Sequence, residues 1–187
     1  MEISKTLHVS DRKAWRRWLQ KNHRPEKEIW LIYYRKETGR PRIPYHEAVE
    51  EALCFGWIDS TAKKMDHDRF AQRFSPRRPG SKYSQTNKER LRLLIARRLV
   101  PEDILSGLGD IDPEKFVFPA DLMKALRANK PAYDNFKKFA APYRRIRVAY
   151  IDSARQRPAE FKKRLENFLK LTAQGKQFGY GIESFYS

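Results

Sequence analysis

The chain of 187 residues is 40% hydrophobic and 13% aromatic, which is enough apolar material for an ordinary core and excludes global disorder. Its single cysteine excludes an intrachain disulfide and a multi-cysteine zinc site. The formal net charge of +17 favours anionic partners such as phosphates, nucleic acid or acidic proteins.

Three elements are predicted in the first part of the chain. Asp11 can cap a helix, because apolar residues recur at helical spacing over residues 14–19. Residues 27–36, with IWLIYY at their centre, are rich in β-branched and aromatic side chains and predict a strand buried on both faces. Residues 45–55 return to a helical period, and Gly56 is a natural stop for that helix.

A hairpin and a cationic loop come next. Residues 57–60 and 69–74 predict two short strands, with the turn between them at residues 65–68. Pro76 ends the second strand, and the loop that follows extends to Tyr83.

The rest of the chain is predicted to be mainly helical. Thr86 and Glu89 fit a capping box at the start of a helix, with Ser84 as an alternative cap. Residues 101–118 mix a short helix with a loop and form the best candidate boundary. Four helices follow over residues 120–127, 132–139, 143–155 and 159–173. Prolines at positions 131, 142 and 158 separate them, and each proline marks the start of the next helix. The aromatic-rich tail is expected to dock on them.

These elements predict an α+β fold. A small antiparallel-type sheet packed with helices would occupy residues 1–100, residues 101–118 would connect, and residues 119–187 would form a C-terminal helical segment. The first twenty residues contain no apolar run, so we expect no signal peptide and a cytoplasmic location. No window approaches eighteen apolar residues, so we expect no membrane span.

The excess positive charge lies in two blocks. Residues 63–98 hold 12 Lys/Arg and 3 Asp/Glu, and residues 137–170 hold 11 Lys/Arg and 3 Asp/Glu. Prolines and a glycine interrupt the first block, so its cations sit on a loop, and we favour a functional role there. For the second block, we favour the interpretation that its basic side chains form a solvated face that keeps the protein soluble. A role of this block in binding stays open.

The stretch from residue 50 to residue 87 resembles the YdeI/OmpD-associated family, also labelled bacteriocin-protection proteins. The matching features are EEALCFGWIDS at residues 50–60, RFSPRRP at residues 73–79, and then Ser84 and Asn87. The resemblance extends over most of the chain, with residues 101–118 poorly matched. It implies a link to envelope stress or to bacteriocin and antimicrobial-peptide tolerance, and it implies no established catalytic mechanism.

The first basic block also supplies the candidate site. Guanidinium groups match phosphate or carboxylate oxygens with two parallel hydrogen bonds, and hydroxyls and a helix N-terminus add donors. We therefore predict a groove that binds an anionic small molecule or nucleic acid. The predicted ligand-binding residues are Trp57, Asp59, Arg73, Ser75, Arg77, Arg78, Lys82, Tyr83, Ser84 and Asn87. The structural alternative is that these arginines pair with the acidic residues Glu47, Glu50 and Glu51.

Two other functions stay open at this stage. Asp59 is a candidate general base in a small enzyme acting on an anionic substrate; alternatively, it forms a structural ion pair or caps a turn. The basic C-terminal helices are candidates for binding an acidic protein, and the oligomeric state is left open. Cys54 lies on an apolar stripe near a helix end, where a thiol is usually inert. We expect neither a metal site nor a cofactor, since the four histidines are scattered and no phosphate-binding glycine loop is present.

Overall fold

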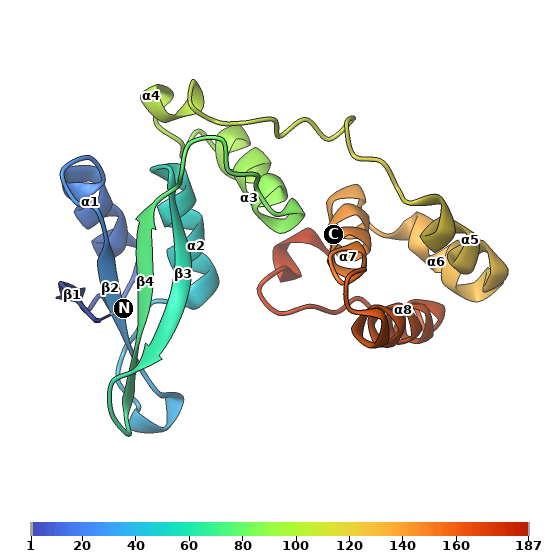
Figure 1. The fold of residues 1–187 in the computed structure, drawn as a ribbon, viewed down its shortest axis with the longest axis horizontal. Helices are drawn as coiled ribbons and strands as arrows, with labels where there is room; N and C mark the ends of the chain where they lie inside the picture. The colour runs from blue at the N-terminus through green and yellow to red at the C-terminus, as the bar shows by residue number, and fades with distance from the viewer. Residues whose placement is uncertain (1, 187) are drawn as a thin grey trace. The chain divides into compact units, whose positions relative to one another are not determined.

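The structure, a computed structural model, describes residues 2–186, and these form two compact units. Unit 1 consists of residues up to 83 together with 90–110, and unit 2 consists of residues 84–89 together with those from 111 onward. Figure 1 shows that unit 1 carries the sheet and that unit 2 is helical. The α+β class predicted from the sequence is therefore confirmed.

The sheet of unit 1 has four strands in the order β1-β2-β4-β3. They are β1 (Thr6–Leu7), β2 (Ile29–Tyr34), β3 (Trp57–Lys64) and β4 (Arg69–Pro76). The predicted strand and hairpin are present, and β4 pairs antiparallel with both β2 and β3. The two-residue β1 was not predicted; it pairs parallel with β2, which makes the sheet mixed rather than purely antiparallel.

Two helices supply the other side of the unit 1 core. These are α1 (Arg12–Asn22) and α2 (Tyr45–Cys54), and the side chain of Asp11 caps α1 by accepting from the amide of Ala14 at 2.8 Å. Trp15 of α1 is fully buried, and its ring lies 5.5 Å from that of Phe74 on β4. Gly56 has a φ of +71°, which an L-side chain rarely adopts, so glycine allows the chain to leave α2 and enter β3 at once.

Three further elements lie before residue 106. They are the 3₁₀ turn η1 (Lys36–Thr38), α3 (Gln85–Ala96) and α4 (Glu102–Leu105). The predicted capping box at Thr86 is wrong, because α3 begins at Gln85 and Thr86 therefore already lies inside the helix. The alternative cap is the one used: the Ser84 hydroxyl accepts from the amide of Asn87 at 3.3 Å.

Unit 2 contains the four helices predicted for the C-terminal segment. They are α5 (Ala120–Ala128), α6 (Lys130–Lys138), α7 (Ala141–Asp152) and α8 (Pro158–Ala173), followed by the 3₁₀ turn η2 (Glu183–Phe185). Their shared core consists of Leu122, Leu126, Ala132, Phe136, Val148, Ile151 and Phe168. The tail docks as expected, since Phe185 is buried and the amide of Phe178 donates to the Tyr143 hydroxyl at 3.0 Å. Within residues 2–186, no helix has the length and apolar character needed to cross a membrane.

Candidate functional site

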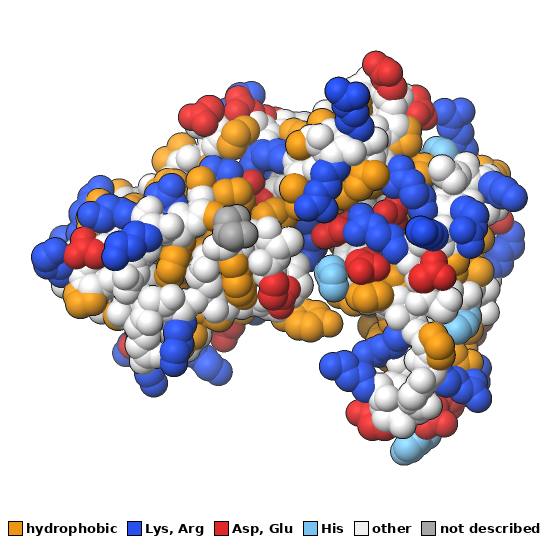
Figure 2. All heavy atoms as spheres, turned by 180° about the vertical axis from the view of Figure 1, so that it is seen from behind, with side chains coloured by type: hydrophobic (Ala, Val, Ile, Leu, Met, Phe, Trp, Pro, Cys, Tyr) orange, Lys and Arg blue, Asp and Glu red, His pale blue; other side chains and the backbone are white. Residues whose placement is uncertain are grey.

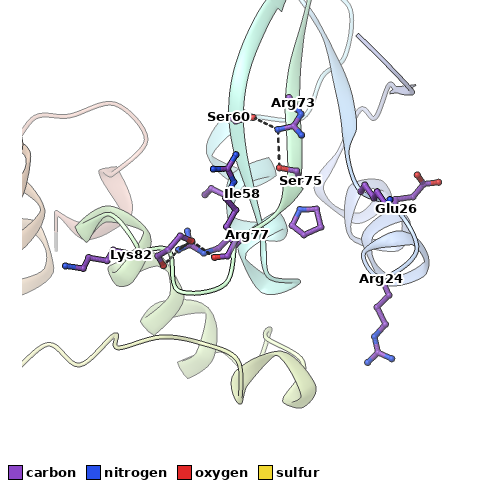
Figure 3. Close-up of a pocket in the computed structure, with 12 residues that line it drawn as sticks. Arg24, Glu26, Ile58, Ser60, Arg73, Ser75, Arg77 and Lys82 are labelled. Carbon is purple, nitrogen blue, oxygen red and sulfur yellow. Dashed lines mark hydrogen bonds between the residues drawn. The ribbon is translucent and has the colours of Figure 1, made fainter. Parts of the chain in front are cut away.

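A basic groove lies on unit 1, where the β3–β4 hairpin meets the loop after α1 and the loop after β4 (Figure 3). Its volume is about 610 Å³. The lining residues are Arg24, Glu26, Lys27, Ile58, Ser60, Arg73, Ser75, Pro76, Arg77, Arg78, Ser81 and Lys82. Six of them are basic and one is acidic, so the potential inside the groove is positive.

Strand alternation decides which side chains reach the groove. Successive side chains on a strand point to opposite faces, so residues two apart share a face. Ile58 and Ser60 of β3 share the groove face with Arg73 and Ser75 of β4, and Ile58 is paired directly with Ser75. The sheet thereby places two hydroxyls and one guanidinium next to one another.

Trp57 and Asp59 point to the other face of β3, and the predicted placement of both in the groove is corrected. The Trp57 indole is 1% exposed and donates through Nε1 to the carbonyl of His23 at 2.9 Å. Asp59 accepts a hydrogen bond from the hydroxyl of Tyr45 at the start of α2. Both residues therefore join the hairpin to helices instead of lining the groove.

Arg73 is held by a carboxylate that is not part of the groove lining. Its Nε and Nη2 each lie 2.7 Å from Oε2 of Glu28, just before β2. Nη1 lies 3.3 Å from the Ser60 hydroxyl and 3.4 Å from that of Ser75, as Figure 3 shows. Hydrogen bonds from Ser4 and then from Arg73 lower the pKa of Glu28. Arg73 therefore orients the two hydroxyls, and most of its charge is already compensated.

Arg77 is positioned without a carboxylate. Its guanidinium stacks over the ring of Tyr83, with 3.5 Å from Cζ to the ring centroid. Nη2 donates to the carbonyl of Ser81 at 2.7 Å and to its hydroxyl at 2.9 Å. Burial raises the pKa of the Tyr83 hydroxyl, so this ring stays neutral at physiological pH. Tyr83 thus holds Arg77 in place from outside the groove lining.

Three further cations of the groove have no ion pair among the residues that the structure describes. They are Lys27, Arg78 and Lys82, and all three are exposed. Arg24 differs, because its Nη2 lies 2.6 Å from Oδ2 of Asp103. The single acidic lining residue, Glu26, is paired with Lys5 at 2.7 Å. The uncompensated positive charge is therefore concentrated on the loop after β4 and at Lys27.

The remaining predicted partners do not join the groove. Ser84 and Asn87 lie in unit 2 and belong to the cap of α3. The acidic residues proposed as structural partners are also used elsewhere: Glu50 and Glu51 pair with arginines of α1, namely Arg12 and Arg16. Those carboxylates therefore do not neutralise the groove arginines.

Seven lining residues lie outside the predicted set, namely Arg24, Glu26, Lys27, Ile58, Ser60, Pro76 and Ser81. Four of these seven carry hydrogen-bond donors that a ligand could use. Ser60 carried a signal, since it stands two residues from Ile58 on a predicted strand. Arg24 and Lys27 carried none, because their position depends on β2 pairing with β4 and no local pattern gives that pairing. Ser81 lies in the predicted cationic loop, and its contact with Arg77 depends on the loop conformation.

Neither metal binding nor thiol chemistry is indicated in the described part of the chain. No group of three or more His, Cys, Asp or Glu side chains among residues 2–186 is arranged to hold a metal ion. Cys54 is fully buried, and burial raises the pKa of its thiol to about 12.

Two family models match different parts of this chain. Residues 7–106 match the model described as a domain of unknown function, DUF8412. Residues 115–175 match the model described as Bacteriocin-protection, YdeI or OmpD-Associated. The second match confirms the resemblance noted from the sequence, although the motif at residues 50–87 falls within the first. No curated protein and no solved structure matches this chain.

Proposed function

The chain belongs to the family described as a domain of unknown function, DUF8412, whose model matches residues 7–106, and we propose that the groove of unit 1, which lies within these residues, binds a phosphate-bearing ligand. One observation carries the proposal. Lys27, Arg78 and Lys82 line the groove without an ion pair in residues 2–186, and Arg77 beside them has no carboxylate partner.

The arrangement suits a ligand with several negative oxygens. Guanidinium groups offer paired N–H donors to phosphate, and lysines add mobile point charges. The hydroxyls of Ser60 and Ser75, already oriented by Arg73, supply further hydrogen bonds. A volume of about 610 Å³ lies within the range of ligand pockets, roughly 300–1,000 Å³, and exceeds what a single phosphate fills. These features support a nucleotide or a short nucleic-acid segment.

Binding has more support than catalysis. The enzyme hypothesis needs Asp59 as a base at the ligand, but Asp59 points to the opposite face and is engaged by Tyr45. Glu26, the one carboxylate in the lining, is paired with Lys5. A base positioned toward a ligand is therefore missing from the groove lining.

An acidic protein bound by the basic C-terminal helices has less support than the groove. Several cations of that block are already paired inside unit 2: Arg145 with Glu89 at 2.6 Å, and Arg155 with Asp121 at 2.8 Å. Figure 2 likewise shows acidic side chains interspersed among the Lys and Arg side chains over the visible face.

The family description supports a wider physiological role. Its wording names bacteriocin protection and OmpD association, and we propose that phosphate binding at the groove serves such tolerance. Expression of the native chain and of a groove variant in a bacteriocin-sensitive host would test this link. Equal protection by both would refute it.

The binding proposal is tested by fluorescence polarisation with a labelled single-stranded oligonucleotide, in competition with a nucleoside diphosphate and with pyrophosphate. If each of four uncompensated cations neutralises one phosphate, log Kobs should fall against log salt with a slope of about −2.8. Competition by the nucleotide at micromolar concentration would favour a small ligand, and competition only by longer oligonucleotides would favour nucleic acid. No binding of any probe at low salt, or a slope near zero, would refute the proposal.

A further inference from the structure

Arg147 of α7 is a buried charge without a counter-ion. The residue is 7% exposed, and its guanidinium forms no ion pair within residues 2–186. Its Nε is buried and has no hydrogen-bond partner. Buried arginines in proteins are almost always paired, because desolvating a charge is costly unless an opposite charge compensates it. The groove of unit 1 does not explain why an unpaired arginine is buried at this position in unit 2.

Aromatic rings surround the guanidinium instead of carboxylates. Its Cζ lies 4.0 Å from the centroid of the Phe178 ring and 4.9 Å from that of Tyr150. Burial lowers the pKa of Arg147. The neighbouring Arg164 is compensated by Glu160 at 2.6 Å, so that carboxylate is already in use. Ring faces attract a cation but cannot accept its N–H groups as an oxyanion does.

A glycine turn lies directly against this guanidinium. A Cβ placed on Gly179 would lie 3.3 Å from Nη1 of Arg147 and 2.5 Å from Ile182, so only glycine fits without rearrangement. Gly179 has a φ of +136° and Gly181 a φ of +70°, and Tyr180 between them is 84% exposed. The backbone thus approaches Arg147 at a turn that reaches the surface.

We propose that Arg147 anchors a second oxyanion site, in unit 2, that takes the carboxylate or phosphate group of a small ligand. A bound oxyanion supplies the hydrogen-bond acceptors and the negative charge that Arg147 lacks in the chain itself. If the position served packing alone, an apolar side chain of similar length would serve better, because replacing uncompensated buried charge by hydrophobic residues is commonly neutral or stabilising. The proposal does not depend on the groove of unit 1.

Glycine amides allow both sites to be followed in one experiment. The chain has eight glycines. Gly80 lies in the loop that carries Arg78 and Lys82, Gly179 lies against Arg147 with Gly181 two residues further along the same turn, and Gly39 lies at neither site. The full chain labelled with ¹⁵N-glycine is titrated with inorganic phosphate and, separately, with acetate. We expect saturable shifts of the Gly179 and Gly181 amides, and the anion that acts at the lower concentration identifies the preferred class. No shift at Gly179 and Gly181 with either anion would overturn the proposal.

Two variants separate this site from the groove. In Arg147→Met, the shifts at Gly179 and Gly181 should disappear while that at Gly80 persists. In the variant carrying both Arg78→Glu and Lys82→Glu, the pattern should reverse, so failure of one site is distinguishable from failure of the other. Shifts at Gly179 that survive in Arg147→Met would contradict the assignment.

Thermal melting provides an independent readout. Without added anion, Arg147→Met should melt at or above the temperature of the native chain, because a buried unpaired charge is removed. With phosphate or acetate, the native chain should gain stability at this site, and Arg147→Met should not. Arg147→Lys keeps the charge and loses the paired donors, so its anion-dependent gain should be smaller than that of the native chain. A large loss of melting temperature in Arg147→Met would make the residue structural and overturn the proposal.

Discussion

Reversing the charges of Arg78 and Lys82 should weaken phosphate binding by two to three orders of magnitude. A unit charge about 4 Å from a phosphate contributes about 1 kcal/mol in bulk water, and reversal replaces that attraction by an equal repulsion. Each substitution therefore costs about 2 kcal/mol, and the pair about 4 kcal/mol, at low salt. Since about 1.4 kcal/mol is a factor of ten, this is close to 10³-fold, and salt screening reduces it toward about 10²-fold.

The same substitutions should leave the fold intact. Both side chains are exposed and have no ion pair within residues 2–186, so the free energy of unfolding should change by less than about 0.5 kcal/mol. Lys13→Glu with Arg35→Glu is the matched control: both are exposed cations of unit 1 outside the groove lining. It produces the same change in net charge.

The test measures fluorescence polarisation of one labelled oligonucleotide and thermal melting for the native chain, the groove variant and the control variant. It shows whether the groove is the binding site. The groove variant should lose affinity far beyond the control, at equal melting temperature. Equal losses in both variants would mean that net charge alone drives binding, and the groove would not be the site.

Three further predictions test individual side chains. Asp59→Asn should change phosphate affinity by less than about twofold, since Asp59 faces away from the groove; a loss of an order of magnitude would restore it to the site. Cys54 should resist alkylation in the native chain at pH 8 and react only after denaturation, because burial raises the pKa of its thiol to about 12; rapid native labelling would contradict this. Glu28 should titrate, by NMR of its carboxyl carbon, below the ordinary value of 4.5. Its depressed pKa adds stability that is present above pH 4.5 and is lost as the pH falls through the folded-state pKa; titration at or above 4.5 would show that Ser4 and Arg73 do not hold the carboxylate.

Local patterns were sufficient for most elements of the fold. The IWLIYY strand, the two amphipathic helices of unit 1 and the helices marked by Pro131, Pro142 and Pro158 all follow from periodicity and backbone restriction within a few residues. The two-residue β1 could not be predicted in the same way. It exists because its backbone pairs with β2, more than twenty residues away, and two residues carry no period.

The candidate site was predictable in its charge and not in its geometry. The cationic loop with Arg77 and Arg78 was visible as a run of residues. The face to which Trp57 and Asp59 point was not predictable. Alternation along a strand shows which side chains share a face, but it does not show which of the two faces is packed against the core. That choice depends on Trp57, whose burial beside α1 turns Asp59 to the same side.

Ion pairs between residues far apart in the sequence account for the other differences between the predicted site and the observed one. Arg73 was expected to bind ligand, yet its guanidinium is compensated by Glu28, which stands 45 positions earlier in the chain. The contact arises because β2 and β4 are neighbours, with Trp30 opposite Arg73. The sequence shows both charges but not their distance, so it could not separate the compensated arginine from Arg78 and Lys82.

The central claim is that the groove of unit 1 holds an oxyanion, and a crystal structure of the full chain grown with tungstate tests it most directly. Tungstate mimics phosphate and is located by its anomalous scattering. We predict a peak within hydrogen-bond distance of the Arg77 or Arg78 guanidinium and near the Ser75 hydroxyl. A well-diffracting crystal in which tungstate occupies other surfaces and leaves this groove empty, with the groove free of lattice contacts, would contradict the account.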